Sequence, residues 1–229
     1  MDLDEVLEEI RMGRPILIYD SDNRERETDI TISSKFVTKD IIKMMRKDGG
    51  GLICTTLPYS YGKKIGIDYL VDIFKKSGYE IFQYLYPNDI PYDEKSAFSI
   101  TINHRRTFTG ITDNDRALTI YEFYNLLEKI ENMDRENAMK EFGRYFRSPG
   151  HVHLLLASDE LLKVRRGHTE LSTALMKMAG LIPSATIVEM MGDDGNALPK
   201  DLAKKYAEKN GMFFIEGSKI IEWWNEWSE

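Results

Sequence analysis

A dense charged segment between two apolar runs is the feature that most constrains this chain. It spans residues 19–29 and reads Tyr-Asp-Ser-Asp-Asn-Arg-Glu-Arg-Glu-Thr-Asp. The run before it, Pro15–Tyr19, is short and rich in β-branched residues, which is typical of a buried strand. The run after it, Ile30–Ser33, alternates apolar and polar residues, which predicts a half-buried strand. The charged segment is therefore fixed where two strands meet.

The charged segment cannot continue as one straight strand. An extended backbone would place Arg24 and Arg26 on the face that the following strand turns toward the core, and a buried arginine without a partner is costly. We therefore expect a bend between Asp20 and Thr28. An acidic cluster of this density repels itself unless a cation or a basic ligand lies among it, although a solvated charged hairpin is the alternative interpretation. The acidic residues are Asp20, Asp22, Glu25, Glu27 and Asp29.

The length and composition fit one globular domain, which we assign to residues 1–229. Hydrophobic residues make up 42% of the chain and charged residues 30%. The formal net charge of −7 argues against a nucleic-acid binder that relies on phosphate neutralisation. The chain has neither an apolar run of about 18 residues nor a basic-then-apolar leader. We therefore expect a cytoplasmic protein with no nucleic-acid or membrane partner.

The chain contains a single cysteine, Cys54. One cysteine excludes an intrachain disulfide and any cysteine-based zinc or iron–sulfur site. The surrounding run, residues 51–57, is typical of a strand interior. We expect Cys54 to pack in the core, with a position in a pocket wall as the alternative.

Helix and strand patterns follow one another along the chain, which predicts an α/β fold. The glycine triplet 49–51 ends a helix and precedes a strand, whereas phosphate-binding loops run from strand to helix, so we interpret it as a turn of close backbone approach. Residues 97–103 predict a strand with Phe98, Ile100 and Ile102 on one face. The Trp-rich tail 220–229 is expected to cover the core or an interface. Helices are expected at residues 3–12, 38–48, 118–130, 169–180 and 199–210, and other strands at 15–19, 30–33, 51–57, 184–191 and 212–215.

A basic helix start near residue 165 has the outline of an anion site. Arg165, Gly167 and His168 stand just before Thr169, where the pattern predicts the helix to open. The amides and dipole of a helix start favour a phosphate, Gly167 permits close approach, and Arg165 can make a bidentate contact. Basic residues also precede helices by chance. The loop 107–116 could likewise present hydroxyl donors at a helix start, or be an ordinary surface loop.

Two titratable groups suit acid/base chemistry. His151 follows a Pro-Gly turn and would share one strand face with His153, where two histidines can bind a metal or serve as hydrogen-bonded wall residues. Glu189 lies in the apolar run 184–191, where a carboxylate needs a partner or has a raised pKa. Both properties are features of working acids and bases.

Taken together, five motifs resemble the 3,4-dihydroxy-2-butanone 4-phosphate synthase family in order and approximate spacing, over nearly the whole chain. The first and fourth are specific and the others supporting. Many family members read Arg-Glu-Asn-Glu-Gly-Asp where this chain has Arg26 and Thr28, and residues 125–146 are longer than usual. The motifs are Arg24–Asp29, Thr109–Arg116, Pro149–His151, Arg165–Glu170 and Glu189.

The resemblance implies a lyase that converts D-ribulose 5-phosphate to 3,4-dihydroxy-2-butanone 4-phosphate and formate, a step of riboflavin biosynthesis. It implies a divalent cation, usually magnesium, with manganese or another divalent ion as a substitute because one ligand is an imidazole. By the family pattern Glu25 and His168 bind the metal, and His151 and Glu189 are the catalytic acid/base groups. The substrate-binding residues would be Arg24, Glu25, Asp29, Arg165, Arg166, Gly167, His168 and Thr169.

The family fold is a three-layer α/β arrangement around a mixed β-sheet, and its members are homodimers with active sites at the subunit interface. Many bacterial relatives carry an additional cysteine-liganded cyclohydrolase domain, which a chain with one cysteine cannot form. Two other functions are alternatives: a YrdC-like carbamoylation enzyme that binds nucleotide and RNA, and a non-catalytic sugar-phosphate sensor. Neither needs a buried carboxylate at position 189 or the pair Glu25 and His168.

Overall fold

The computed structural model describes residues 2–228, and within them seven strands form one mixed sheet in the order β4-β5-β3-β6-β2-β1-β7. Strand β1 pairs with β7 and β3 with β5 in parallel, and the other neighbours are antiparallel. The predicted α/β fold with a mixed sheet is confirmed. The strands are β1 (Ile16–Tyr19), β2 (Thr28–Ser33), β3 (Cys54–Leu57), β4 (Phe98–His104), β5 (Phe146–Leu156), β6 (Ala185–Glu189) and β7 (Phe214–Glu216).

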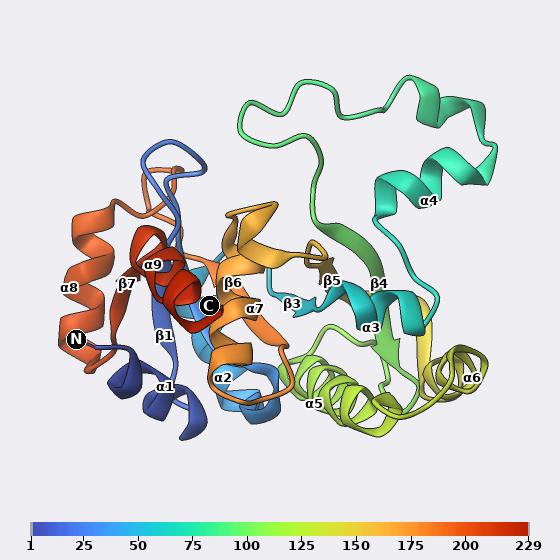
Figure 1. The fold of residues 1–229 in the computed structure, drawn as a ribbon, viewed down its shortest axis with the longest axis horizontal. Helices are drawn as coiled ribbons and strands as arrows, with labels where there is room; N and C mark the ends of the chain where they lie inside the picture. The colour runs from blue at the N-terminus through green and yellow to red at the C-terminus, as the bar shows by residue number, and fades with distance from the viewer. Residues whose placement is uncertain (1, 229) are drawn as a thin grey trace.

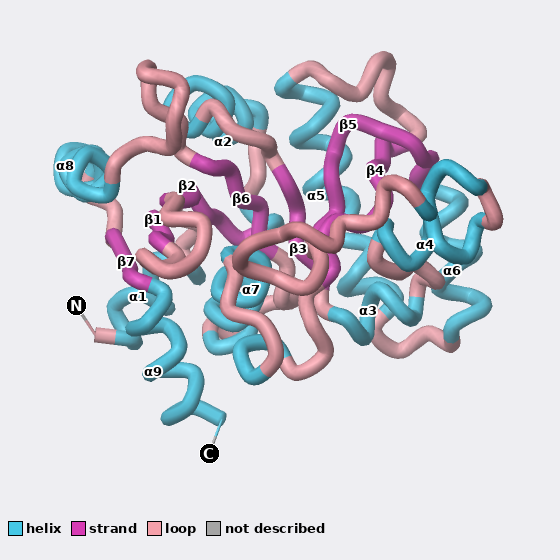
Figure 2. Tube along the Cα trace, turned by 90° about the horizontal axis from the view of Figure 1, so that it is seen from above, coloured by secondary structure: helices cyan, strands magenta, loops and turns pink. Residues whose placement is uncertain are grey.

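Helices cover both faces of the sheet, which gives the three layers that the resemblance implied. Figure 2 shows the sheet with α2 and α5 on one side and α7 and α9 on the other. The helices are α1 (Leu3–Arg11), α2 (Lys39–Met44), α3 (Tyr59–Lys64), α4 (Leu70–Ser77), α5 (Asp113–Ile130), α6 (Arg135–Tyr145), α7 (His168–Met178), α8 (Lys200–Asn210) and α9 (Gly217–Ser228). A π-helical turn (Met45–Gly49) continues α2, and short 3-10 turns lie at Ser34–Phe36, Glu80–Gln83 and Leu161–Lys163.

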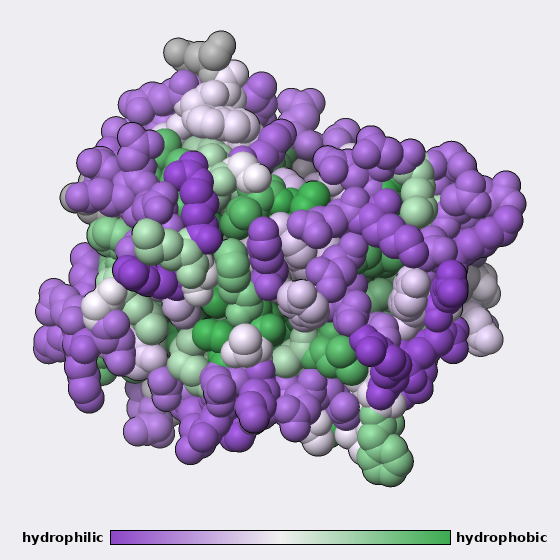
Figure 3. Space-filling model, turned by 90° about the horizontal axis from the view of Figure 1, so that it is seen from below, coloured by the Kyte–Doolittle hydropathy of each residue, from purple (hydrophilic) through white to green (hydrophobic). Residues whose placement is uncertain are grey.

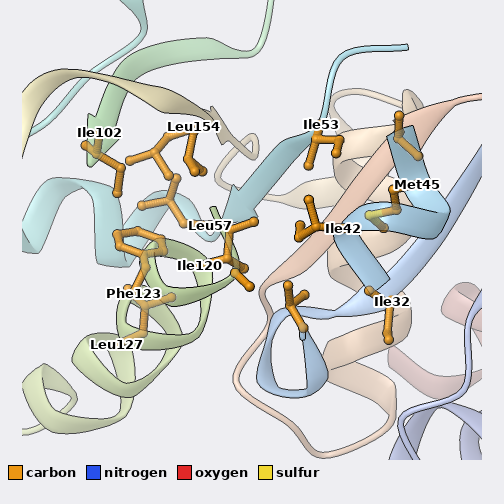
Figure 4. Packing of buried hydrophobic residues seen from close by; sticks show 14 of the residues in the cluster. Ile32, Ile42, Met45, Ile53, Leu57, Ile102, Ile120, Phe123, Leu127 and Leu154 are labelled. Carbon is orange, nitrogen blue, oxygen red and sulfur yellow. The ribbon is translucent and has the colours of Figure 1, made fainter. Parts of the chain in front are cut away.

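Each face of the sheet has its own apolar core. On one face α2 and α5 pack against the sheet, and Figure 4 shows side chains such as Ile42, Ile120 and Phe123 meeting strand residues Leu57 and Leu154. On the other face α1, α7 and α9 pack against the sheet in a second cluster. Figure 3, which views the molecule from below, shows a mostly hydrophilic rim around hydrophobic residues gathered toward the middle. None of the helices within residues 2–228 is long and apolar enough to cross a membrane.

Helix ends follow the predicted chemistry. Thr38 caps α2 through its side chain, and the π-helical turn that continues α2 ends at Gly50 with a φ of 89°. As expected, the backbone of the glycine triplet approaches a neighbouring residue closely: a Cβ on Gly51 would lie 2.3 Å from Glu189 Oε2. Gly211 ends α8 with a φ of 63°.

Three local predictions were wrong: the burial of one strand, the exposure of a residue in another, and the start of a helix. Strand β2 is buried on both faces rather than half-buried, since it lies between β1 and β6 under helices on both sides. In β4 a register irregularity leaves Phe98 38% exposed, although Ile102 is buried as predicted. Helix α5 begins at Asp113, not 118, because Thr112 caps it. The expectation for the tail is confirmed, because Trp223 and Trp224 are core residues.

An irregular segment projects from this compact body. Figure 1 shows α4 standing away from the sheet and the chain after it returning to β4. We call residues 78–97 the arm. Apart from one 3-10 turn it has no helix or strand, and several of its large apolar side chains are exposed.

Candidate active site

The bend predicted for the charged segment is a turn organised by one carboxylate. Asp20 is 3% exposed and accepts the backbone N–H of Glu25 at 2.9 Å and that of Glu27 at 3.1 Å. Arg26 adopts a φ of 61°, which lets the chain reverse, and its Nε donates to the Asp22 carbonyl at 2.7 Å. Asp20 therefore fixes the loop that presents Arg24 and Glu25.

The loop, the start of α7, the strand ends and the returning arm enclose one cavity of about 430 Å³. Figure 1 shows the β1–β2 loop at the same end of the molecule as the start of α7. A larger apolar hollow of about 640 Å³ lies on the arm and contains none of the predicted site residues. The predicted residues that line the 430 Å³ cavity are Arg24, Glu25, Asp29, Arg165, His168, Thr169 and Glu189.

One end of this cavity, which we call the cation corner, consists of Asp20, Glu25, Asp29 and His168. The Nδ1 atom of His168 lies 3.2 Å from Glu25 Oε2, and its Nε2 lies 3.2 Å from the Ile18 carbonyl. Asp29 Oδ1 is buried, has no hydrogen-bond partner among residues 2–228 and lies 3.6 Å from His168 Nε2. Three carboxylates thus surround one imidazole.

Charge crowding in the cation corner shifts its pKa values. Burial lowers the pKa of His168, but the carboxylates of Asp29, Glu25 and Asp20 outweigh it and raise that pKa to about 10. Burial raises the pKa of Asp29 well above its usual range, against the opposing charge of His168. Burial also opposes ionisation of Glu25, yet the hydrogen bond and charge of His168 lower the pKa of Glu25. The corner therefore retains a proton in the absence of another cation.

The donor set of the cation corner fits a divalent metal ion. Ligand atoms of Asp20, Glu25 and His168 lie within 4.8 Å of one another. When His168 Nε2–H donates to the Ile18 carbonyl, Nδ1 keeps a lone pair for a metal, and a backbone carbonyl is a common outer partner of ligating histidines. Oxygen atoms with one imidazole suit magnesium or manganese.

Next to the cation corner lies a second group, which we call the anion corner and which consists of Arg24, Arg165, Asp93 and Glu170. Arg24 Nη1 lies 3.6 Å from Asp20 Oδ2 and 4.0 Å from Glu25 Oε1, so the two corners adjoin. Arg165 Nε and Nη2 lie 3.0 and 2.7 Å from Asp93 Oδ2, and Arg165 Nη1 lies 2.6 Å from Glu170 Oε2. Arg24 Nη2 contacts the same Asp93 oxygen. Burial lowers the pKa of Arg165, but the charges of Glu170 and Asp93 outweigh it and raise that pKa.

Helix α7 supports both corners. It begins at His168, one residue earlier than predicted, with Gly167 as its N-cap and no side-chain cap among the described residues. Gly167 must lack a side chain because a Cβ there would lie 2.4 Å from Arg165 Nη1 and 2.9 Å from Arg24 Nη1. The helix is buried almost all round, including Leu171, Leu175 and Met178.

Glu189 lies at the end of β6 and is half-buried. Its Oε2 accepts the backbone N–H of Leu52 at 2.7 Å. The turn before β3 therefore supplies the hydrogen-bond partner that we expected for a carboxylate in this apolar strand. In the antiparallel pairing of β2 and β6, Glu189 lies opposite Asp29. Glu189 thus lines the cavity with one of its oxygens held by the backbone.

Three predicted site residues are not part of the cavity lining: Arg166, Gly167 and His151. Gly167 is buried beside the two arginines at the start of α7, and Arg166 is exposed. His151 is exposed too, because residues 148–151 bulge out of the β4–β5 ladder instead of forming a turn before the strand. Asn103 contacts His151 twice. Asn103 Nδ2 lies 3.2 Å from His151 Nδ1, and Asn103 Oδ1 accepts the backbone N–H of His151 at 2.8 Å.

Two further residues of the site had no role assigned from the sequence. Asp93 lines the cavity from the irregular arm, and Glu170 is a fully buried residue of α7 that contacts Arg165 from outside the cavity lining. No periodic signal marks Asp93. Glu170 could have been found, because a carboxylate near two arginines at a helix start needs a partner. Cys54 is 2% exposed and also lines the cavity, so both interpretations of it hold.

Comparison with known proteins gives a direct assignment. Residues 4–223 match the family model described as 3,4-dihydroxy-2-butanone 4-phosphate synthase. The chain belongs to this family. The synthase of Methanothermobacter thermautotrophicus is 48% identical, covering 96% of this chain and 94% of that protein. The synthase of Archaeoglobus fulgidus is 44% identical over 100% of this chain and 96% of its own.

The fold agrees with the same family. A solved 3,4-dihydroxy-2-butanone 4-phosphate synthase in complex with two magnesium ions superposes with a TM-score of 0.75 at 23% identity, covering 97% of this chain and 95% of the other. The family match does not support the YrdC-like alternative. Departures from the family pattern are accommodated locally: Arg26 takes the positive φ that asparagine tolerates, and the long region 125–146 forms the end of α5 and α6.

Proposed function

We propose that this protein is a lyase that converts D-ribulose 5-phosphate to 3,4-dihydroxy-2-butanone 4-phosphate and formate, a step of riboflavin biosynthesis, within a single domain. The observation that carries the proposal is a cavity with a metal-type corner, an arginine pair and a carboxylate, in a chain of this synthase family. Its volume of about 430 Å³ lies within the usual range of small-molecule sites, about 300–1,000 Å³. The cytoplasm, where sugar phosphates are used, is the proposed location.

Magnesium is the proposed cofactor, with manganese as a substitute. Glu25 and His168 would hold it, and Asp20 lies close enough to assist. A bound divalent cation polarises substrate oxygens and stabilises the negative charge that enolisation and rearrangement develop. A solved member of the family in complex with two magnesium ions supports this choice.

The residues of this chain divide the remaining tasks. Arg24 and Arg165 are proposed to bind the phosphate, and Asp29 and Thr169 the sugar hydroxyls. Glu189, with one oxygen held by the Leu52 N–H, is proposed to take and return protons through its other oxygen as enolisation, dehydration and loss of C4 as formate proceed. The arm and strand ends restrict water around the bound sugar.

His151 has its proposed role in a homodimer. Because it is exposed and outside the cavity of its own chain, we infer that it acts as an acid/base group in the cavity of a partner subunit. The dimer follows the family pattern. In this arrangement each active site needs Glu189 from one chain and His151 of the partner subunit.

Mixing inactive variants tests the shared site. Dimers reassembled from equal amounts of His151→Asn and Glu189→Gln should recover about a quarter of wild-type activity, because half of the dimers are mixed and each mixed dimer has one intact site. The matched control mixes Glu25→Gln with Glu189→Gln. Both changes then lie on the same side of the site, so no activity should return; a fully active monomer in sedimentation would exclude the dimer.

The reaction itself is tested by incubating the purified protein with D-ribulose 5-phosphate and magnesium and measuring formate release. Stoichiometric formate and the four-carbon phosphate are expected. Binding of the sugar phosphate without turnover would instead indicate a sensor, and a requirement for ATP would indicate a carbamoylation enzyme.

A further inference from the structure

The arm returns to the body of the protein at the anion corner. After its exposed outer part, residues 90–93 reach the cavity wall, and Tyr92 places its ring 5.4 Å from the Arg24 guanidinium carbon. Asp93 then inserts its carboxylate between the arginines, where its side chain is 14% exposed. An acidic residue on an irregular segment thus occupies the most basic part of the cavity.

Asp93 takes the donors that a phosphate would use. Its Oδ2 accepts from Nε and Nη2 of Arg165, the edge of a guanidinium that binds a phosphate bidentately. The same oxygen contacts Arg24. The remaining nitrogen of Arg165, Nη1, is bound to Glu170. Each of the three guanidinium nitrogens of Arg165 therefore already faces a carboxylate, and the Nε/Nη2 edge is occupied by Asp93.

The two carboxylates on Arg165 differ in how firmly they are held. Glu170 is 0% exposed, lies on α7 and accepts the Ser158 N–H at 2.9 Å through its second oxygen. Asp93 lies on the arm, outside any helix or strand. Glu170 is therefore the permanent partner of Arg165, and Asp93 is the partner that can be exchanged.

We propose that Asp93 is a specificity-determining residue that occupies the phosphate subsite of Arg24 and Arg165 until a phosphorylated substrate displaces it. The inference rests on the proposed function in one respect, since the displacing group is taken to be the phosphate of the sugar. A phosphate carries more charge and more acceptor oxygens than a carboxylate, so it can replace Asp93 on both arginines. A neutral sugar has no anionic group to replace the Asp93 carboxylate on the arginines, so the arm stays in place.

Displacement fits the charges better than joint binding. The two guanidinium groups are already balanced by Asp93 and Glu170. A phosphate dianion added beside Asp93 would meet a like charge at contact distance. Release of Asp93 removes that repulsion and exposes the Nε/Nη2 edge at the same time.

The variant Asp93→Asn tests the proposal with inorganic phosphate as the probe. Calorimetry should show phosphate binding about tenfold more tightly to Asp93→Asn than to the wild type, because a charged competitor for Arg165 has been removed. The Michaelis constant for D-ribulose 5-phosphate should fall by a similar factor. Asp93→Ser should behave in the same way and guards against an effect peculiar to the amide.

The neighbouring residue supplies the matched control. Glu94 is exposed and takes part in none of the ion pairs found among residues 2–228. Glu94→Gln removes the same charge from the same segment, and its phosphate affinity should stay within about twofold of the wild type. Unphosphorylated D-ribulose is the matched ligand, and Asp93→Asn should change its affinity by less than about twofold.

Three results would overturn the proposal. Weaker phosphate binding by Asp93→Asn would show that Asp93 positions the arginines, and unchanged binding would show that it does not compete. An equal gain for D-ribulose would show that Asp93 closes the cavity to all sugars. Absence of formate release by the wild type would instead count against the proposed function alone, because the phosphate titrations do not depend on turnover.

Discussion

The two adjoining corners of the site carry opposite excesses of charge, although Arg24 and Glu25 are neighbours in the chain. In the cation corner three carboxylates surround one imidazole, and Arg24 lies 3.6 Å from Asp20 and 4.0 Å from Glu25. A retained proton or a metal ion supplies further positive charge there. In the anion corner two guanidinium groups already have carboxylate partners from the protein. The cation corner therefore needs an added positive charge in order to be stable. The anion corner must instead release one of its own carboxylates before it can bind an added anion.

The largest effect is expected from breaking the cation corner. Glu25→Gln or His168→Ala removes one of two proposed metal ligands, and loss of several kcal/mol of charge stabilisation should lower kcat/KM at least about ten-thousandfold. Exhaustive chelation should have the same effect on the wild type. Formate release is the measurement, with circular dichroism to check folding; full turnover after chelation would contradict the metal role.

Glu189 lines the same cavity, and its variant should separate proton transfer from binding. Glu189→Gln keeps the shape and the acceptor for the Leu52 N–H, but it cannot exchange a proton. Turnover should fall by about two to four orders of magnitude, with substrate and metal affinity little changed. Single-turnover rates and calorimetry measure the two parts. A defect confined to binding would make Glu189 a wall residue.

Breaking the anion corner should affect binding first. Arg165→Ala should raise KM about tenfold to a hundredfold, with a smaller change in kcat, because the phosphate does not react. The variant should also lose stability, since Glu170 is fully buried and would lose its cationic partner.

The double variant Arg165→Ala, Glu170→Gln is the matched control for that loss. It should recover stability in thermal denaturation while KM stays high. If KM recovered as well, the effect of Arg165 on the substrate would be indirect.

The smallest expected effect is on the pH dependence of stability. The raised pKa values of His168 and Asp29 mean that the folded, metal-free protein binds more protons than the unfolded chain. The contribution of His168 is fully present below its unfolded pKa of about 6.5 and is lost as pH rises toward about 10. Denaturant titrations between these pH values should show falling stability.

Magnesium should reduce this dependence because a metal ion takes over the charge of the proton. The same titrations with added magnesium measure the difference. Stability that rose with pH in the metal-free protein would contradict the assigned pKa shifts of the cation corner.

The sequence alone was sufficient for the α/β class and for much of the cavity. Alternating helix and strand periods, Thr38 as a cap and the glycines after helices are local signals, so they do not depend on the rest of the fold. The bend in residues 20–27 could be predicted because straight continuation would bury unpaired arginines. The site residues came from motifs whose spacing resembles one family, and most of them line one cavity.

Only the tertiary structure decided how these groups meet. The burial of β2 and α7 on all sides depends on which elements pack over them, which no period in their own sequence encodes. The position of Asp93 depends on the path of the arm, and the exposure of His151 depends on a bulge against β4. The sequence thus determined which chemical groups are present, and long-range packing decided which of them are paired, because pairing is set by distance and burial rather than by order along the chain.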